Sequence, residues 1–413
     1  MAVVGAGAFG RNHLRVLREL ETAGDGVALV AAVDTDAARA EEATKQYGIA
    51  AFATIEELLK ADLKLDAAIV AVPTVKHHEV AAALLDAGLD LLVEKPLAAN
   101  LAEADDLIAR AERGGRILQP GHLERFNPAV LAVEANLKRP MFFEAHRLSV
   151  FTPRALDVDV VLDLMIHDLD IVLTFAKSEV REVRAVGLPI LSPKVDIANV
   201  RVEFESGCVA NFTASRVSTE RVRKLRFFEP RQYVSIDYAR RDVLVIRVDS
   251  GVSGAGGVRT PPKQSLDGAP DSQPRLAEAA AEFLATGKLD SAVIQKLLAS
   301  GQIPATLAMK IAVAKNDPEK LREIAKGLAG PQDGPQDGGQ AGVGPGLSFV
   351  KPEVKEGEPL RLEILSFLEA VRTRREPKVT ARQGRAALDL ALTIQATMAA
   401  HAERAGLGDF FKN

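Results

Sequence analysis

Three glycines near the start of the chain are spaced for binding a dinucleotide. Gly5, Gly7 and Gly10 directly follow a short apolar strand and directly precede a predicted helix. In such a motif the first glycine permits a tight turn, the second lets the backbone approach phosphate oxygens, and the third lets the helix pack on its strand. The helix N-terminus then points at the pyrophosphate. The motif, with Ala8 and Phe9 inside it, predicts a nicotinamide cofactor site.

Asp34 predicts which dinucleotide is bound. It ends the apolar run 27–33 and follows Gly10 by 24 residues, where an acid accepts hydrogen bonds from the ribose hydroxyls. A carboxylate at this position repels the 2′-phosphate of NADP, so NAD is the expected cofactor and NADP the less favoured one. Thr35 and Arg39 lie nearby in the sequence and moderate this preference. The alternative is an ordinary glycine turn followed by a helix-capping aspartate.

A histidine lies between two carboxylates on another predicted helix. Asp163, His167 and Asp170 are spaced i, i+4 and i+7, which places them on one face of a helix. A carboxylate there can orient the imidazole, whose ordinary pKa near neutrality suits it to accept a proton from an alcohol. The alternative is that His167 is a buried histidine of the core with no role in chemistry.

The first 120 residues must position the cofactor-binding groups, and they alternate apolar strands with helices. This alternation predicts a parallel, doubly wound sheet with ligands at the carboxyl ends of its strands. Three loops then line one crevice, at 5–10, 73–77 and 94–96. The cofactor-binding residues expected from the second and third loops are Pro73, Thr74, His77, Glu94 and Lys95.

The character of the sequence changes after residue 120. Several segments with strand composition are separated by turn signals, which predicts a mostly antiparallel sheet. One helix, over 157–175, interrupts them, and two amphipathic helices follow at 359–374 and 380–404. The expected fold class is therefore α/β, with an N-terminal Rossmann sheet and a C-terminal α+β domain that contains a mostly antiparallel open sheet.

Residues 251–346 depart from this pattern. A stretch rich in Gly, Pro and Ser leads into an alanine-rich helical stretch over 274–328, and Pro-Gln-Asp-Gly then occurs twice in succession. We predict a helical insertion with a low-complexity linker. The expected domains are an NAD-binding domain at 1–120, a substrate-binding and oligomerisation domain at 121–250 and 347–413, and this insertion.

Composition excludes several classes of protein. The chain has 52 basic and 56 acidic residues, a net charge of −4, so nothing attracts it as a whole to nucleic acid or an anionic membrane. The single Cys208 excludes an internal disulfide and a multi-cysteine metal site, and it fits the cytoplasmic location that we expect. No signal peptide is evident, and no apolar stretch approaches the roughly 20 residues of a membrane span. The first strand is unusually short, which leaves open whether the natural chain begins a few residues earlier.

Three segments resemble one family of oxidoreductases. They are Pro-Thr-Val-Lys-His at 73–77, Glu-Lys-Pro at 94–96, and Asp-Leu-Met-Ile-His-Asp-Leu-Asp at 163–170. Together they resemble the glucose-fructose oxidoreductase, inositol dehydrogenase and rhizopine-catabolism family, called Gfo/Idh/MocA. The resemblance extends from residue 1 to about 250 and resumes from about 355 to 404.

This resemblance implies an NAD-dependent dehydrogenase that oxidises a secondary alcohol. Such a reaction needs a base for the hydroxyl proton and a group that stabilises charge on the oxygen. The resemblance assigns the acid/base role to His167 and contacts with the substrate hydroxyl to Lys95 and Asp163. Lys95 would need desolvation or a nearby cation to serve as the base instead. His122 is expected to touch a sugar hydroxyl.

Within the family, the segments 121–128 and 157–167 resemble UDP-N-acetylglucosamine 3-dehydrogenases. This implies a sugar-nucleotide substrate and a 3-keto product for a downstream aminotransferase that makes diamino sugars of lipid A. Arg125, Arg147 and Arg154 are then candidate clamps for the diphosphate, because guanidinium binds phosphate oxygens through two parallel hydrogen bonds.

Other interpretations stay open. The substrate can instead be a free sugar or a cyclitol, or the chain can be an NAD-binding regulator without activity, although Lys95, Asp163 and His167 together favour the enzyme. His122, His167 and Asp163 could also be metal ligands, but nothing else supports a zinc site and we expect no metal. The open sheet needs a covering partner, so a homo-oligomer, a dimer or tetramer, is expected.

Overall fold

The computed structural model describes residues 1–134, 137–152, 158–248 and 347–407. The chain divides into two compact units, 1–251 with 346–413, and 252–345. All described residues belong to the first unit. Arg154 and the insertion predicted at 251–346 lie outside the described residues.

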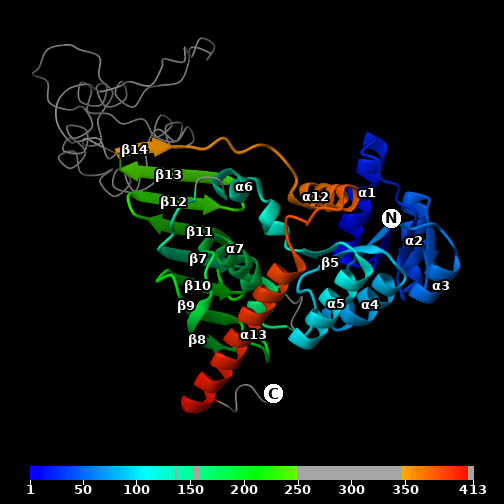
Figure 1. The fold of residues 1–413 in the computed structure, drawn as a ribbon. Coiled ribbons are helices and arrows are strands. Elements are labelled where there is room, and N and C mark those ends of the chain that lie inside the picture. Colours follow the sequence, from blue (N-terminus) through cyan, green and yellow to red (C-terminus); the bar gives the residue numbers. More distant parts are fainter. Residues whose placement is uncertain (135–136, 153–157, 249–346, 408–413) are drawn as a thin grey trace, which may run out of the picture. The chain divides into compact units, whose positions relative to one another are not determined.

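The N-terminal part forms a six-stranded parallel sheet with helices on both faces (Figure 1). The strand order is β3-β2-β1-β4-β5-β6, in which the direction of winding reverses between β1 and β4, where ligands bind. This confirms the predicted doubly wound sheet. Its strands are β1 (Ala2–Val4), β2 (Ala31–Val33), β3 (Ala50–Phe52), β4 (Ala67–Val70), β5 (Asp90–Glu94) and β6 (Leu118–Gly121). Its helices are α1 (Ala8–Ala23), α2 (Ala37–Tyr47), α3 (Ile55–Lys60), the 3₁₀ turn η1 (Thr74–Lys76), α4 (His77–Asp86) and α5 (Leu101–Gly114).

A second sheet has eight strands in the order β14-β13-β12-β11-β7-β10-β9-β8. Only the β7–β10 pair is parallel among these described strands, so the prediction of a mostly antiparallel sheet is confirmed. The strands are β7 (Phe142–Leu148), β8 (Val180–Leu188), β9 (Ile197–Phe204), β10 (Val209–Ser215), β11 (Val222–Glu229), β12 (Gln232–Asp237), β13 (Asp242–Val248) and β14 (Leu347–Val350).

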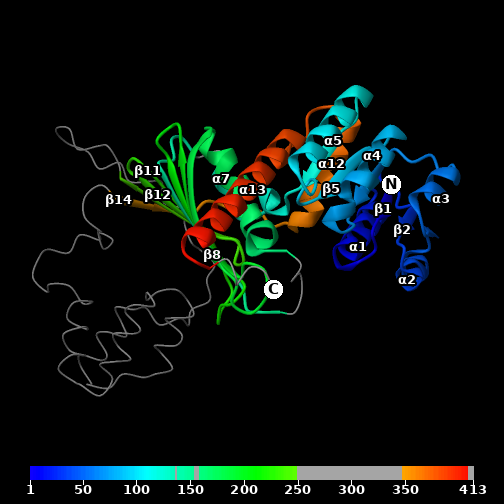
Figure 2. The same cartoon turned by 90° about the horizontal axis from the view of Figure 1, so that it is seen from below.

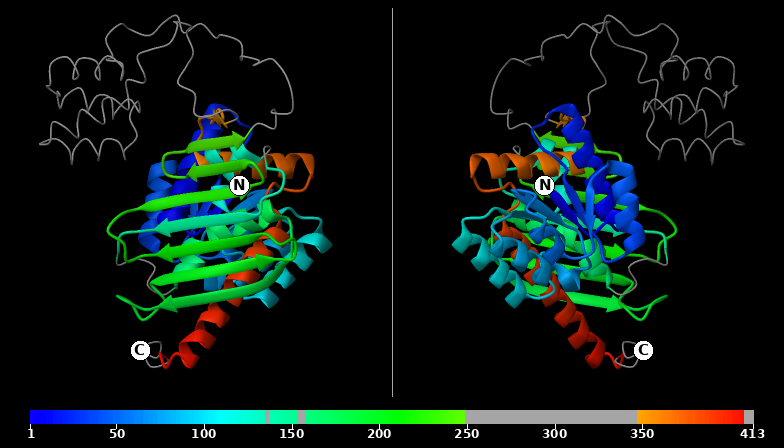
Figure 3. Two further views of the ribbon diagram at one scale, coloured as in Figure 1. Left: turned by 90° about the vertical axis from the view of Figure 1, so that its left-hand side faces the viewer. Right: turned by 90° about the vertical axis from the view of Figure 1, so that its right-hand side faces the viewer.

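Helices cover one face of this second sheet, and Figure 3 (left) looks onto the other face, which no described helix covers. The alternation along β7 explains this arrangement, since Phe143 and Ala145 are buried while Phe142 and Glu144 are half-buried. The helices of this part are η2 (Leu123–Phe126), α6 (Pro128–Glu134), the π-helical turn η3 (Val161–Met165), α7 (Ile166–Ala176) and α13 (Ala381–Arg404).

The remaining helix, α12 (Pro359–Thr373), packs with the first sheet (Figure 2). Its Ile364 and Phe367 share a core with Leu14 and Leu17 of α1. Helix α12 was predicted as part of the substrate-binding domain, but it packs in the core of the NAD-binding part. Helix α13 contributes to both cores and so ties the two sheets together.

Candidate active site

The turn before α1 requires glycine at two positions. Gly5 has a φ of +95°, and a Cβ added there would lie 2.6 Å from the carbonyl oxygen of Ala71. A Cβ on Gly10 would lie 1.7 Å from the carbonyl oxygen of Gly5. The backbone therefore follows the tight path that the glycine motif predicts, and larger residues are sterically excluded at both ends of it.

The middle of the same motif is open. A Cβ on Gly7 would approach only the Arg39 guanidinium, at 4.0 Å. Gly7 is the N-cap of α1, and no side chain caps this helix. Ala8 and Phe9 form the exposed first turn, so their backbone N–H groups are available to an anion. This cradle fits the pyrophosphate of a dinucleotide.

Asp34 is held beside this cradle at the carboxyl end of β2. One carboxylate oxygen, Oδ2, accepts a hydrogen bond from the Ala6 N–H at 2.7 Å, and Oδ1 accepts one from the Asp36 N–H at 2.9 Å. Arg39 Nη1 lies 3.9 Å from Oδ2 and is half exposed. The fixed carboxylate is placed to bind ribose hydroxyls and oppose a 2′-phosphate, while Arg39 offsets part of that repulsion.

The loop after β4 carries Pro73, which is exposed, and Thr74, which is half-buried. His77 differs from the prediction. Its ring is buried, with Nδ1 2.8 Å from the carbonyl oxygen of Pro96 and Nε2 2.9 Å from that of Val72. Burial lowers the pKa of His77, against the effect of these carbonyls. His77 therefore joins two loops and presents no ring nitrogen to the cofactor, which corrects its predicted role.

The third loop supplies Glu94 and Lys95. Glu94 Oε1 lies 2.7 Å from Nε2 of the buried His13 in α1; burial would raise the pKa of Glu94, but His13 and Lys95 bring it below its ordinary value. Glu94 thus supports α1 with its carboxylate, whereas its predicted role was cofactor contact.

Lys95 Nζ donates hydrogen bonds to the carbonyl oxygens of Asp163 at 2.8 Å and Leu162 at 3.4 Å. The structure therefore brings together the predicted catalytic segments from the two sheets.

His167 lies in the first turn of α7, directly after η3. Its Nδ1 is buried and has no hydrogen-bond partner among the described residues. Burial lowers the pKa of His167 well below its ordinary value, and the positive charges of Lys95 and Arg147, then His122 and Arg223, lower it further. The imidazole is therefore neutral at neutral pH, the form that accepts a proton.

The carboxylates predicted to orient His167 turn elsewhere. Asp163 Oδ1 lies 3.9 Å from Lys95 Nζ, and Asp170 faces His122 and Arg125. The prediction of a carboxylate that orients the imidazole is therefore wrong in the described structure. For Asp163 the physical reason is η3, because its i→i+5 hydrogen bonds change the i, i+4 alignment with His167. For Asp170, within α7, the reason is its contacts with Arg125 and His122.

Two predicted substrate-binding residues lie in one buried cluster. His122 Nδ1 is 3.8 Å from Asp170 Oδ2, and Arg125 Nη1 is 3.3 Å from Asp170 Oδ1. Arg125 also donates a hydrogen bond to the Thr174 hydroxyl. Because Arg125 is only 3% exposed, it is a structural ion-pair partner, and its predicted role as a diphosphate clamp is corrected. His122 is equally buried, and neither ring nitrogen has a hydrogen-bond partner in the described part of the chain, so the expected contact with a sugar hydroxyl stays a prediction.

Arg147 is also fully engaged. Its Nε and Nη2 donate to the Asp168 carboxylate at 2.7 and 3.0 Å, and Nη1 donates to Glu124 at 3.0 Å. The guanidinium lies 5.1 Å from the centre of the Tyr238 ring. Arg147 is therefore a buried ion-pair partner that links β7 to α7. Its predicted role as a diphosphate clamp is corrected as well.

The sequence interpretation missed Arg223, whose charge acts on His167. Arg223 lies on β11, a strand that was not predicted because basic residues alternate there with apolar ones. Leu225 and Phe227 of this strand are buried, so period-two alternation at these positions is the signal that identifies the strand.

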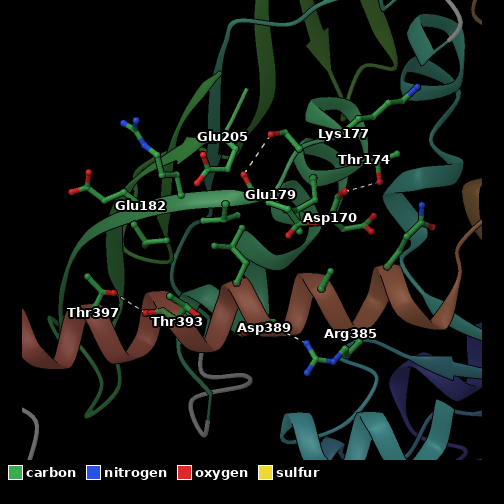
Figure 4. Close-up of a pocket in the computed structure, with 18 residues that line it drawn as sticks. Asp170, Thr174, Lys177, Glu179, Glu182, Glu205, Arg385, Asp389, Thr393 and Thr397 are labelled. Atoms are coloured by element: carbon green, nitrogen blue, oxygen red, sulfur yellow. Dashed lines mark hydrogen bonds and ion pairs between the residues drawn. The ribbon is translucent and has the colours of Figure 1, made fainter. Parts of the chain in front are cut away.

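A separate hollow of about 1130 Å³ lies between α7, α13 and β8 (Figure 4). Asp170 and Thr174, which hold Arg125, line it. Arg385 and Asp389, which also line it, pair with each other at 2.9 Å, and we assign no reaction to this hollow.

Two further searches cover the described residues only. No group of three or more His, Cys, Asp or Glu gathers there in a way that could hold a metal ion. Among the helices that the structure describes, none combines the length and apolarity needed to cross a membrane.

Comparison with known proteins places the chain in a family. Residues 1–122 match the oxidoreductase family with an NAD-binding Rossmann fold, and residues 129–231 match the GFO/IDH/MocA C-terminal domain. UDP-N-acetylglucosamine 3-dehydrogenase of Acidithiobacillus ferrooxidans is 36% identical over 259 residues, which is 62% of this chain and 80% of the relative. scyllo-Inositol 2-dehydrogenase (NAD(+)) of Bacillus subtilis is 28% identical over 52% of this chain and 67% of the relative.

A solved structure of the same Acidithiobacillus ferrooxidans enzyme is also similar. It matches with a TM-score of 0.69 and 26% identity, over 100% of this chain and 98% of that chain. The two family models, the glycine cradle and the relatives agree. The chain therefore belongs to the Gfo/Idh/MocA family of oxidoreductases and is an NAD-dependent dehydrogenase.

Proposed function

We propose that this dehydrogenase oxidises the 3-hydroxyl of UDP-N-acetylglucosamine, or of a closely similar sugar nucleotide, to a ketone. The observation that best supports a hydroxyl-oxidising site is the contact of Lys95 with Asp163, which joins the cofactor crevice to the start of α7 beside a neutral His167. Similarity to the Acidithiobacillus ferrooxidans relative supports the sugar nucleotide.

Each side chain has a definite part in this mechanism. NAD, when bound, supplies the acceptor for the hydride that leaves the carbinol carbon. His167 accepts the hydroxyl proton on its imidazole, and the Lys95 ammonium stabilises the charge that develops on the oxygen. Asp163, half-buried beside Lys95, accepts a hydrogen bond from a neighbouring sugar hydroxyl and so orients the ring. In this proposal Lys95, which follows β5, and Asp163 and His167, of η3 and α7, supply the chemistry, while the glycine cradle and Asp34 hold the cofactor.

A second candidate is oxidation of a free sugar or cyclitol. The inositol dehydrogenase among the relatives supports it. The two candidates differ in charge, because a sugar nucleotide carries a diphosphate and a cyclitol carries none.

The wider setting is part of the proposal. A 3-keto sugar nucleotide is a substrate for an aminotransferase, which would lead to diamino sugars such as those of lipid A in the cytoplasm.

The uncovered face of the second sheet carries a cluster of three aromatic rings. The ring centroids of Phe142 and Phe228 are 5.5 Å apart, and those of Phe228 and Tyr233 are 5.1 Å apart. We propose that a second copy of the chain covers this face, because soluble proteins rarely expose such clusters. Light scattering of the purified protein would show a monomer mass if this is wrong.

Steady-state formation of reduced nicotinamide tests the substrate. The protein is assayed with NAD and UDP-N-acetylglucosamine, N-acetylglucosamine, glucose or myo-inositol, with an aminotransferase added to remove a keto product. We expect the highest kcat/KM for the sugar nucleotide. A higher kcat/KM for myo-inositol or glucose would contradict the proposal and establish the second candidate.

A further inference from the structure

Arg223 is a partly buried cation that the mechanism above does not use. It pairs in register with Arg147 across the β7–β11 ladder and lies on the same face of β11 as Leu225 and Phe227. Its Nε is buried without a hydrogen-bond partner, and within the described residues no ion pair of its guanidinium is found. Burial, followed by the charge of Arg147, lowers the pKa of Arg223.

The position of Arg223 follows from contacts around α7. Arg147, its cross-strand neighbour, holds Asp168 with two hydrogen bonds, and Asp168 is the next residue after His167. The charge of Arg223 also contributes to the lowered pKa of His167. Arg223 therefore lies beside the reacting centre, on the side formed by the second sheet.

The carboxylates around Arg223 are already committed. Asp168 is engaged by both Nε and Nη2 of Arg147, and Glu124 accepts hydrogen bonds from Arg147 and from Asn127. A partly buried guanidinium next to another cation is unfavourable unless an anion compensates it. Arg221, two residues earlier and exposed, adds a further positive charge beside it.

We infer that Arg223, assisted by Arg221, forms the subsite that receives the diphosphate of the sugar nucleotide. The inference rests on the proposed function. Guanidinium binds phosphate oxygens through two parallel N–H donors, and Nε provides one of them. Arg223 thus takes the role for which Arg125 and Arg147 are too deeply buried and paired, and it distinguishes a sugar nucleotide from an uncharged sugar or cyclitol.

The test compares Arg223→Met and Arg223→Lys with Arg226→Met. Arg226 is a matched control, because it lies on the same strand but on the opposite face, where it pairs with Glu144 at 2.9 Å. KM and kcat are measured with UDP-N-acetylglucosamine and with the best uncharged substrate, and binding of UDP, uridine and NAD is measured by calorimetry. Arg223→Met should raise KM for the sugar nucleotide and Kd for UDP roughly 10- to 150-fold, as expected for loss of a charged hydrogen-bond pair. Uridine and NAD binding and the KM of the uncharged substrate should change less than about twofold.

The outcomes separate the two hypotheses. Arg223→Lys keeps the charge but loses the two parallel N–H donors, so its KM for the sugar nucleotide and its Kd for UDP should lie between those of wild type and Arg223→Met. Both constants of Arg226→Met should match those of wild type. If wild type oxidises UDP-N-acetylglucosamine and Arg223→Met leaves KM and UDP binding unchanged, the subsite is wrong and the proposed function stands. If wild type oxidises only uncharged substrates, the proposed function fails, and UDP binding then tests the subsite by itself. Loss of UDP binding in Arg223→Met supports the anion subsite. UDP binding that is unchanged in Arg223→Met overturns the anion subsite. Unchanged NAD binding shows that each variant is folded.

Discussion

At the scale of single residues, the proposed reaction depends on a histidine that stays neutral. Burial and neighbouring cations hold the pKa of His167 well below its ordinary value, so the base remains unprotonated as pH falls past the ordinary range of histidine. We expect kcat/KM to stay level from neutral pH down through that range and to decline only at more acidic pH. A pH–rate profile measures this.

The matching variant is His167→Ala, which should lower kcat about 10²- to 10⁴-fold, the usual contribution of a general base, and should remove the acid limb. NAD affinity should not change. An acid limb at or above the ordinary histidine pKa, or one that persists in His167→Ala, would show that another group accepts the proton, with Lys95 as the leading candidate.

We predict that Asp34 controls the choice between NAD and NADP. Both of its oxygens are fixed by backbone N–H groups, so the carboxylate cannot turn away from a 2′-phosphate, while Arg39 is near enough to bind one once the carboxylate is removed. Asp34→Ser should therefore narrow the ratio of kcat/KM for NAD to that for NADP, mainly through KM. A wild-type enzyme that uses NADP as well as NAD would contradict this.

At the scale of elements, the two glycines Gly7 and Gly10 of the turn before α1 should differ in role, Gly10 being needed for folding and Gly7 for NAD binding. A Cβ on Gly7 would come no closer than 4.0 Å to another residue, the Arg39 guanidinium, whereas one on Gly10 would lie 1.7 Å from the Gly5 carbonyl oxygen. Gly7→Val should therefore keep the wild-type melting temperature and circular dichroism but lose NAD binding, because the side chain occupies the phosphate position. Gly10→Ala should lower the melting temperature. Equal loss of stability in both variants would show that the cradle is not open at Gly7.

The sequence predicted elements well where one local pattern dominates. Strands β1, β2 and β4 are apolar throughout and fully buried, so their composition alone identifies a parallel sheet. Strand β11 was missed because its basic residues mask the alternation, and η3 was missed because a π-helical turn has no distinct periodicity.

The site was less predictable than the fold, because ion pairing is decided in three dimensions. Local motifs predicted roles for Lys95 and His167, and the structure brings the Lys95 charge close enough to act on His167. The partners of Arg147 are Asp168 on α7, 21 residues away in the sequence, and Glu124 on η2, 23 residues away, and no local spacing indicates them. For the same reason the sequence could not show which arginine lacks a carboxylate partner.

At the scale of the whole molecule, the two ends of the segment 249–346 lie side by side. Val248 of β13 pairs in register with Leu347 of β14, so a short turn can connect the two strands. Replacing 252–345 with a short glycine-rich turn should leave NAD affinity and kcat within about threefold of wild type, since the glycine cradle and His167 belong to the other compact unit. Loss of NAD binding by a folded deletion variant would show that the segment contributes to the site.

In the proposed reaction, hydride leaves C3 of a sugar nucleotide for NAD. Its most direct test is UDP-N-acetylglucosamine deuterated at C3, with C2- and C4-deuterated substrates as controls and mass spectrometry of the nicotinamide product. We expect deuterium in the reduced cofactor from the C3-labelled substrate alone. Deuterium from C4, or reduced cofactor that carries no label from any of the three substrates, would contradict it.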